Sequence, residues 1–256
     1  MAGPLSVVRQ HPSTPPDPLT VRGLTVSYGA RAAVFSVDAV FPRGTMTAIV
    51  GPNGAGKSTF LKGVLGIEKP VAGEVRFFGQ SLSDARRRVA YVPQRASVDW
   101  DFPARVIDVV RMGLYARKGL FRPFGASDTA RARECLAMVG MQDFADRQIG
   151  QLSGGQQQRV FIARSLAEDA DLYLLDEPMA GVDAATEAAI FALLKRLRDE
   201  GRTLVVVHHD LSSVTAMFDR VLVLNRRKIA EGPVAEAFGE DTLTLAYGGR
   251  LTGIRG

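Results

Sequence analysis

The sequence predicts an α/β protein with a mainly parallel sheet, an antiparallel β edge subdomain and an inserted helical subdomain. Two observations point to this class. Short apolar runs alternate with helix-compatible segments, and a glycine-rich loop at residues 51–56 joins one such run to a helix. With 256 residues and 46% hydrophobic content, the chain can bury one full α/β core but not two.

We expect one domain over residues 19–247. Residues 1–18 contain five prolines and no hydrophobic periodicity, which predicts a disordered leader. This leader lacks the long apolar core of a signal peptide. Residues 248–256 form a short C-terminal tail. No stretch reaches the roughly 18 uninterrupted apolar residues of a membrane helix, so the chain is not expected to form a pore itself.

The first part of the domain, from Leu19 to about Phe78, supplies the early strands and the glycine-rich loop. Residues 45–50 read as a buried strand and residues 58–65 as a helix, so the loop falls in a strand-to-helix turn. Residues 73–79 are expected to add a strand to an antiparallel edge sheet.

The loop has the spacing of a phosphate-binding P-loop. Its residues are Gly51, Pro52, Asn53, Gly54, Ala55, Gly56, Lys57, Ser58 and Thr59. The glycines allow positive φ and close backbone approach, so successive N–H groups and the helix N-terminus can surround a polyphosphate. In such loops the lysine reaches the β- and γ-phosphates of ATP and the serine hydroxyl binds Mg²⁺. The alternative is a glycine-rich turn that carries Lys-Ser by chance.

The helical subdomain is expected at residues 95–153. Residues 106–115 and 128–139 have the periodicity of amphipathic helices, and residues 117–126 read as the loop between them. The single cysteine, Cys135, excludes an internal disulfide and is expected to be a buried thiol.

A second glycine-containing motif stands where the chain returns to the core. Ser153 and Gln156 have the spacing of a capping box ahead of an apolar helical run, which places Gly154 and Gly155 in the first turn. Glycine is a poor helix former, so this pair favours the close approach of an anion to the exposed N–H groups. A flexible hinge before an ordinary helix is the alternative.

Two further strands end in polar residues. Residues 172–175 lead into Asp176 and Glu177, whose side chains alternate in direction and so suit different tasks; a solvated acidic turn is the weaker alternative. Residues 203–207 lead into His208 and His209. A metal site is disfavoured for this histidine pair, because adjacent strand residues point to opposite faces and no cluster of cysteines or carboxylates joins them.

Taken together, these motifs resemble the ATP-binding cassette (ABC) ATPases, from about Leu19 to Tyr247. Residues 152–156 read Leu-Ser-Gly-Gly-Gln, the signature of that family, and they follow the P-loop in the family's order. The resemblance implies a P-loop ABC ATPase core that works as a dimer with a second ABC ATPase subunit, a homodimer. Each signature motif then grips the γ-phosphate of ATP held by the partner, and a lone subunit is nearly inactive.

The resemblance also implies roles for single residues. Asp176 would hold Mg²⁺, Glu177 would act as general base on the attacking water, and His209, the histidine directly before Asp210, would contact the γ-phosphate. His208 is left to packing or to the surface.

Three further residues match the family by position. Tyr28 would stack on adenine, although a lone tyrosine after a strand is more often part of a core. Gln94 would touch Mg²⁺ and water. Asp183 would act across the dimer, although Ala180-Gly181-Val182 before it departs from the common Ser-Ala-Leu.

The net charge of +5 raises the question of nucleic acid. The arginines are scattered and no stacking aromatics punctuate them, so no nucleic-acid partner is expected. The run Arg86-Arg87-Arg88 and later basic residues, among them Arg105 and Arg117, leave an anionic membrane surface open as a weaker alternative.

Within the family, the segments 92–95, 98–103, 207–211 and 246–251 resemble the ATPases of bacterial manganese, zinc and iron importers. This implies an ATPase bound peripherally to the cytoplasmic face of the membrane, powering import of manganese first and zinc or iron next. Its partners would be membrane permease subunits and, indirectly, an extracytoplasmic metal-binding protein.

The alternatives are an importer for another small solute, a soluble ABC protein acting on ribosomes or DNA, and a nucleotide-binding module without turnover. The soluble class is disfavoured because its members carry two cassettes or a long coiled coil. Trp100 and Phe102, flanked by acids, suit a socket for the permease; capping of the subdomain core is the alternative.

Overall fold

The computed structural model describes residues 15–29, 31–95, 100, 102–119 and 122–248. Most of the predicted leader and tail lies outside the described residues. So do Val98, Asp99 and Asp101, which belong to the segment 98–103 compared above with the metal importers.

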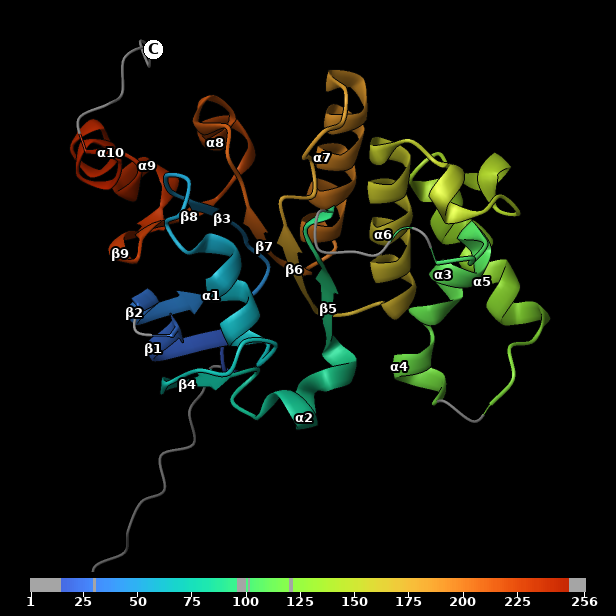
Figure 1. Ribbon diagram of the computed structural model, residues 1–256, viewed down its shortest axis with the longest axis horizontal. Coiled ribbons are helices and arrows are strands. Elements are labelled where there is room, and N and C mark those ends of the chain that lie inside the picture. Colours follow the sequence, from blue (N-terminus) through green and yellow to red (C-terminus); the bar gives the residue numbers. More distant parts are fainter. Residues whose placement is uncertain (1–14, 30, 96–99, 101, 120–121, 249–256) are drawn as a thin grey trace, which may run out of the picture.

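A six-stranded sheet forms the centre of the molecule, in the order β5-β6-β7-β3-β8-β9 (Figure 1). Its first five strands are parallel and its last is antiparallel to β8. The strands are β3 (Met46–Val50), β5 (Val89–Val92), β6 (Leu172–Asp176), β7 (Thr203–Val207), β8 (Arg220–Asn225) and β9 (Arg227–Pro233). The prediction of a mainly parallel sheet, and of strands at 45–50, 172–175 and 203–207, is therefore confirmed.

A second, three-stranded sheet has the order β2-β1-β4 and is antiparallel throughout. It consists of β1 (Leu19–Tyr28), β2 (Arg31–Phe41) and β4 (Ala72–Arg76). The expected antiparallel edge strand is confirmed, although it ends at Arg76 rather than at residue 79. Phe77 and Gln80 instead close a tight turn through two backbone hydrogen bonds of 2.8 Å.

The helices fall into two groups. Four of them, α3 (Val106–Met112), α4 (Tyr115–Lys118), α5 (Ala126–Met138) and α6 (Gly154–Glu168), lie together on one side of the molecule (Figure 1). The others are α1 (Lys57–Val64), α2 (Leu82–Ala85), α7 (Ala184–Asp199), α8 (Leu211–Met217), α9 (Val234–Ala237) and α10 (Glu240–Tyr247).

Two predictions for the helical group need correction. The helix expected at 106–115 ends at Met112. The loop expected from residue 117 begins only after Lys118, because Tyr115–Lys118 is helical. The reason is packing against α6. A Cβ on Gly113 would lie 2.2 Å from the Arg164 carbonyl oxygen, so the chain turns at this contact. The Arg117 guanidinium, 2.6 Å from the Asp169 carboxylate, then holds the short helix in place.

The central sheet separates two hydrophobic cores because successive side chains of a strand point to opposite faces. On β3, Ala48 and Val50 belong to the core shared with α3, α5, α6 and α7, whereas Ile49 belongs to the core shared with α1 and the antiparallel sheet. Both faces of the parallel strands are thus covered, which explains why their sequences are mostly apolar. None of the helices in the described part of the chain combines the length and apolarity that crossing a bilayer requires.

Candidate nucleotide site

The polar residues predicted from the sequence follow neighbouring parallel strands. The register aligns Val92 with Leu175, and Leu175 with Val206, so β5, β6 and β7 end at nearly the same level. Ile49 of β3 is aligned with Val207. Because carboxyl ends of parallel strands meet at one edge of a sheet, the P-loop, Gln94, the Asp176–Glu177 pair and His209 all follow the same edge.

The P-loop surrounds a pocket of about 330 Å³. The pocket is lined by Asn53, Gly54, Ala55, Gly56, Lys57, Ser58, Thr59 and Glu177. Gly56 adopts φ 88° immediately before α1, and a Cβ there would lie 2.4 Å from the Ala33 carbonyl oxygen. Only glycine fits this turn, which directs the first N–H groups of α1 toward the pocket.

Lys57 is 7% exposed, although it carries a charged amine. Its Nζ donates hydrogen bonds to the carbonyl oxygens of Gly51 at 2.8 Å and Pro52 at 3.2 Å. Burial lowers the pKa of the amine, and the nearby carboxylates of Glu177 and Asp176 oppose this shift. The Lys57 amine is therefore held at the loop, where it can bind a phosphate group.

Ser58 and Asp176 form the next contact. The Ser58 Oγ donates to Asp176 Oδ1 at 2.8 Å, and Asp176 is completely buried. Its Oδ2 has no hydrogen-bond partner in the described part of the chain. Burial is the main cause that raises the pKa of this carboxyl to about 6; the hydrogen bond from Ser58 opposes it. A hydroxyl next to a buried carboxylate that keeps one oxygen without a partner in the described residues matches the oxygen ligands that Mg²⁺ prefers.

Glu177 lines the same pocket from the end of β6. Its φ of 50° lies in the left-handed region, which is strained for a glutamate and is typical of functional turns. Gln94, just after β5, donates its Nε2 to Glu177 Oε2 at 3.1 Å. The structure thus brings Gln94, Glu177, Asp176 and Ser58 together at the P-loop.

The two histidines after β7 have different surroundings. His209 is exposed, whereas His208 is 1% exposed and shares a hydrogen bond of 2.7 Å between its Nε2 and Ser213 Oγ. Burial lowers the pKa of His208 to about 4, so it is neutral at physiological pH. Packing is therefore the right interpretation of His208. In the described residues no group of three or more His, Cys, Asp or Glu side chains is arranged to hold a metal ion.

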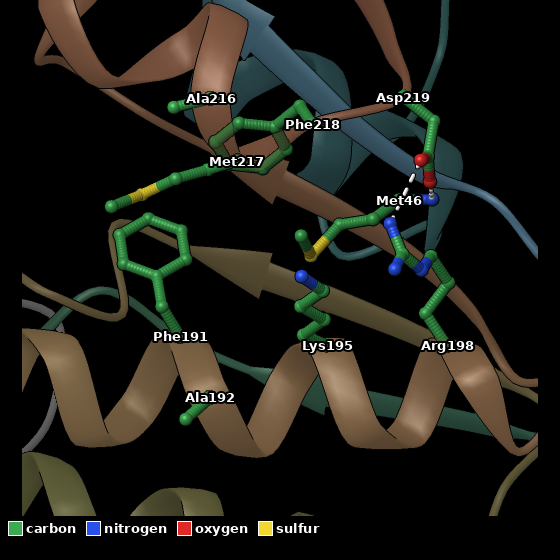
Figure 2. A pocket seen from close by; sticks show the side chains of 9 residues that line it. All are labelled: Met46, Phe191, Ala192, Lys195, Arg198, Ala216, Met217, Phe218 and Asp219. Atoms are coloured by element: carbon green, nitrogen blue, oxygen red, sulfur yellow. Dashed lines mark hydrogen bonds and ion pairs between the residues drawn. The ribbon is translucent and has the colours of Figure 1, made fainter.

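The aromatic neighbours of His208 also line a second, separate hollow of about 200 Å³. Figure 2 shows Phe191 of α7 and Phe218 after α8 on its wall, with Met46 and Lys195 nearby. The Phe191 and Phe218 ring centroids lie 5.6 and 5.3 Å from that of His208. This hollow adjoins the start of β3, at Met46, and shares no lining residue with the P-loop pocket.

The Ser153–Gln156 motif lies at the start of α6 and does not line the P-loop pocket. The Ser153 backbone N–H donates to Gln156 Oε1 at 2.9 Å, and the Ser153 Oγ accepts from the Gln156 N–H at 3.4 Å, so the predicted capping box is confirmed. A Cβ on Gly154 would lie 3.0 Å from the Arg95 guanidinium, and one on Gly155 would lie 3.3 Å from Val182. These glycines therefore fit against two neighbouring segments.

Tyr28 and Asp183 also lie apart from the P-loop pocket. Tyr28 ends β1 and is 50% exposed, so it is not part of the core. Asp183 caps α7, and its Oδ1 accepts from the Thr186 N–H at 2.9 Å. Since Val182 precedes Asp183 and contacts Gly155, the segment 180–183 lies against the start of α6.

Sequence reasoning missed the residues that support the P-loop from behind. The Arg226 N–H donates to the Ala55 carbonyl oxygen at 2.8 Å, and the Ala33 carbonyl oxygen fits against Gly56. Both contacts are made by backbone atoms of distant residues. No side-chain pattern in the sequence could have revealed them.

Most of the clustered basic residues are paired. Ion pairs join Arg88 to Asp171 and Lys118 to Asp128, and Arg105 and Arg111 both contact Asp108. Such pairing reduces the positive charge available to an anionic membrane surface, so this alternative gains no support.

Comparison with known proteins places these features in a family. The family model described as ABC transporter matches residues 34–180, which include the P-loop, the capping-box motif and Asp176–Glu177. The chain belongs to the ABC transporter family. As a member with its nucleotide motifs complete, it is an ATP-binding and ATP-hydrolysing subunit.

Similar ABC proteins extend over nearly the whole chain. The zinc transport system ATP-binding protein TroB of Treponema pallidum is 58% identical over 91% of this chain and 87% of its own length. The manganese transport system ATP-binding protein MntB of Bacillus subtilis is 49% identical over 92% and 94%. A dimeric ATP-binding cassette solved in a post-hydrolysis state with ADP and Pi superimposes with a TM-score of 0.75 at 30% identity, covering 84% of this chain and 98% of that one.

Proposed function

We propose that this protein is the ATPase subunit of a bacterial-type importer for divalent metal ions, manganese first and zinc or iron next. The observation that carries the proposal is the interlocked set of Lys57, Ser58, Asp176, Glu177 and Gln94 around one pocket. The cargo is supported by similar proteins named for zinc and for manganese transport.

Within the pocket, the P-loop residues would bind the phosphates of ATP, with Lys57 moving from Gly51 and Pro52 to the β- and γ-phosphates. Ser58, Asp176 and Gln94 fit Mg²⁺, since they supply oxygen ligands and Asp176 Oδ2 has no partner in the described residues. When bound there, Mg²⁺ would supply positive charge next to the phosphates. Glu177 would take the proton of the attacking water, and His209 would contact the γ-phosphate.

The remaining motifs would act on a second copy of the chain. Ser153, Gly154, Gly155 and Gln156 would meet the γ-phosphate of ATP bound by the partner, and Asp183 would act at the same interface. The observation that these residues do not line the P-loop pocket of their own chain supports this part of the proposal. A dimeric cassette among the similar solved structures supports this arrangement. Tyr28, half-exposed at the end of β1, would stack on the adenine.

The bounds of the ATPase domain and of its helical subdomain also belong to the proposal. We propose a single ABC ATPase domain at residues 19–247 with the helical signature subdomain at 95–153. The contacts of α3 and α5 with α6 support that subdomain, because α6 begins just after residue 153 and joins it to the sheet.

On the membrane side, we propose a permease dimer as partner at the cytoplasmic face, with an extracytoplasmic metal-binding protein acting indirectly. Phe102 is 57% exposed and suits the apolar centre of the socket. Trp100 is only partly exposed. Its ring centroid lies 5.0 Å from that of Phe161 in α6, and its Nε1 donates to the Arg95 carbonyl oxygen at 3.0 Å. Trp100 would thus support the socket from within the chain. The exposed side chain of Phe102 would contact the permease, so Phe102 is the residue to test.

The socket test replaces Phe102 by alanine and measures recruitment of the ATPase to membranes that contain the permease. We expect loss of recruitment and of transport with ATP binding retained. Leu245→Ala, at an exposed leucine of α10, is the matched control. Normal transport in Phe102→Ala would remove Phe102 from the permease interface.

The cargo test is the metal content and growth of a deletion strain under separate limitation of manganese, zinc and iron. We expect a defect that manganese, or else zinc or iron, relieves, and that complementation by the wild-type gene restores. Unchanged uptake of all three metals would contradict the proposal and would favour import of another solute.

A further inference from the structure

The C-terminal helix α10 ends beside the P-loop, far from it in sequence. The Asn225 Nδ2 donates to the Ala246 carbonyl oxygen at 2.9 Å, in the last turn of α10. The next residue, Arg226, donates its backbone N–H to the Ala55 carbonyl oxygen of the loop at 2.8 Å. The end of β8 therefore connects α10 to the P-loop.

Helix α10 is fixed against the body of the protein. Leu243 and Ala246 are 5% and 1% exposed, respectively. Figure 1 shows α10 beside β8 and β9, on the opposite side of the molecule from α3 and α5. Its last residues thus have a defined position relative to the loop.

A second contact reaches the loop directly. Burial raises the pKa of the Tyr247 phenol, and the backbone of Gly51, which the hydroxyl faces, lowers it against this rise. The carbonyl oxygen of this same glycine accepts the Lys57 Nζ at 2.8 Å. Gly51 also lies against β8, since a Cβ there would be 1.9 Å from the Leu224 carbonyl oxygen. Gly51 is therefore fixed by Lys57 and Leu224, and the Tyr247 hydroxyl lies beside it.

We propose that α10 is part of the nucleotide site and that Asn225 and Tyr247 are positioning residues for the P-loop. Neither residue lines the pocket, so they act through Gly51 and Ala55 rather than on ATP. The inference rests on the proposed nucleotide site and is independent of the proposed cargo.

The expected effect follows from how a P-loop binds phosphate. Its N–H groups must converge before the nucleotide arrives, and each anchor that is lost lets the empty loop sample other shapes. Once ATP is bound, the phosphates themselves order the loop. Loss of an anchor should therefore weaken ATP binding and leave turnover at saturating ATP nearly unchanged.

The test uses Tyr247→Phe and Asn225→Leu in the full-length protein. Phenylalanine keeps the ring and removes the hydroxyl; leucine keeps the shape of asparagine and removes the donor without adding charge. We expect each change to raise the Kd for MgATP, measured by calorimetry, and the KM for ATP by roughly three- to tenfold, with kcat retained. The double variant should bind more weakly than either single variant.

Two control variants separate positioning from general stability. Leu245→Ala changes a residue of α10 that is 72% exposed, and Val110→Ala lowers the thermal stability from a buried site in α3. Both should bind MgATP like the wild type. The inference is overturned if Tyr247→Phe and Asn225→Leu keep wild-type affinity, or if Val110→Ala weakens binding equally. If the wild type itself does not bind MgATP, the proposed nucleotide site fails and this inference with it.

Discussion

The P-loop and the start of α6 both present glycines at a helix N-terminus, yet their surroundings are opposite. Lys57 and Asp176 are buried and bonded to partners inside the chain. Ser153 is exposed, Gly154 and Gly155 are half-buried, and a capping box joins Ser153 to Gln156. The first region lines a pocket of its own, whereas the second lines no part of that pocket and lies against Arg95 and Val182. The contrast fits the proposed catalytic site shared by two chains, in which one chain supplies the P-loop and the other supplies the Ser153–Gln156 motif.

The largest expected effect concerns the P-loop pocket, which Glu177 lines. Glu177→Gln removes the base and leaves the P-loop unchanged, so ATP binding should persist while hydrolysis falls at least about a hundredfold. Calorimetry and phosphate release measure the two quantities. Glu200→Gln, at an exposed glutamate beyond α7, should be active. Wild-type hydrolysis in Glu177→Gln would remove Glu177 from the role of base.

The next effect concerns the Ser153–Gln156 motif at the start of α6. Gly154→Asp places a negative charge where the partner's γ-phosphate would approach, so it should abolish hydrolysis without changing the affinity of the P-loop for MgATP. Gly125→Asp makes the same change at the start of α5 and should be active. Weaker nucleotide binding in Gly154→Asp would show that this motif belongs to the chain's own pocket.

The sequence predicted the local elements of both regions. The strand-to-helix turn at 51–56, the strand before Asp176 and the capping box at Ser153 were all predicted correctly, because each is a local pattern of glycine, apolar and capping residues. The short helix at Tyr115–Lys118 was missed because a contact of Gly113 with α6 fixes it.

The contacts that shape the site were also beyond the sequence. Arg226 and Ala33 meet the P-loop, and Arg95 and Val182 lie against Gly154 and Gly155. These contacts join residues far apart in sequence, several through backbone atoms, so no periodicity or spacing records them. Motif spacing therefore predicts which residues form the site, whereas only the folded structure shows which distant residues support them.

A smaller effect tests the burial of Asp176 through pH. Its pKa of about 6 in the folded protein exceeds the ordinary value of 3.8, so between about pH 4 and 6 the unfolded chain releases a proton that the folded chain keeps. The free energy of unfolding should therefore fall as the pH rises through this window. By neutral pH the loss should be on the order of 3 kcal/mol. Asp176→Asn should lack this component, as urea unfolding of nucleotide-free protein would measure. Parallel pH curves for the two proteins would contradict the burial argument.

The smallest effect concerns Tyr28. Loss of base stacking on an exposed ring costs about 1–2 kcal/mol, so Tyr28→Ala should weaken MgATP binding roughly tenfold. Tyr28→Phe should bind normally because stacking needs only the ring. Val40→Ala, which shortens another exposed side chain of the same sheet, is the control in equilibrium binding. Normal affinity of Tyr28→Ala would place the adenine elsewhere.

The most direct test of two unlike half-sites is to mix two inactive variants, Lys57→Ala and Gly154→Asp. Each homodimer lacks one half of both sites. A mixed dimer combines an intact P-loop from one chain with an intact signature motif from the other, so it has one complete site. ATP hydrolysis should therefore appear on mixing and should depend on the ratio of the two variants. Activity no greater than the sum of the two separate variants would contradict a site shared between two chains.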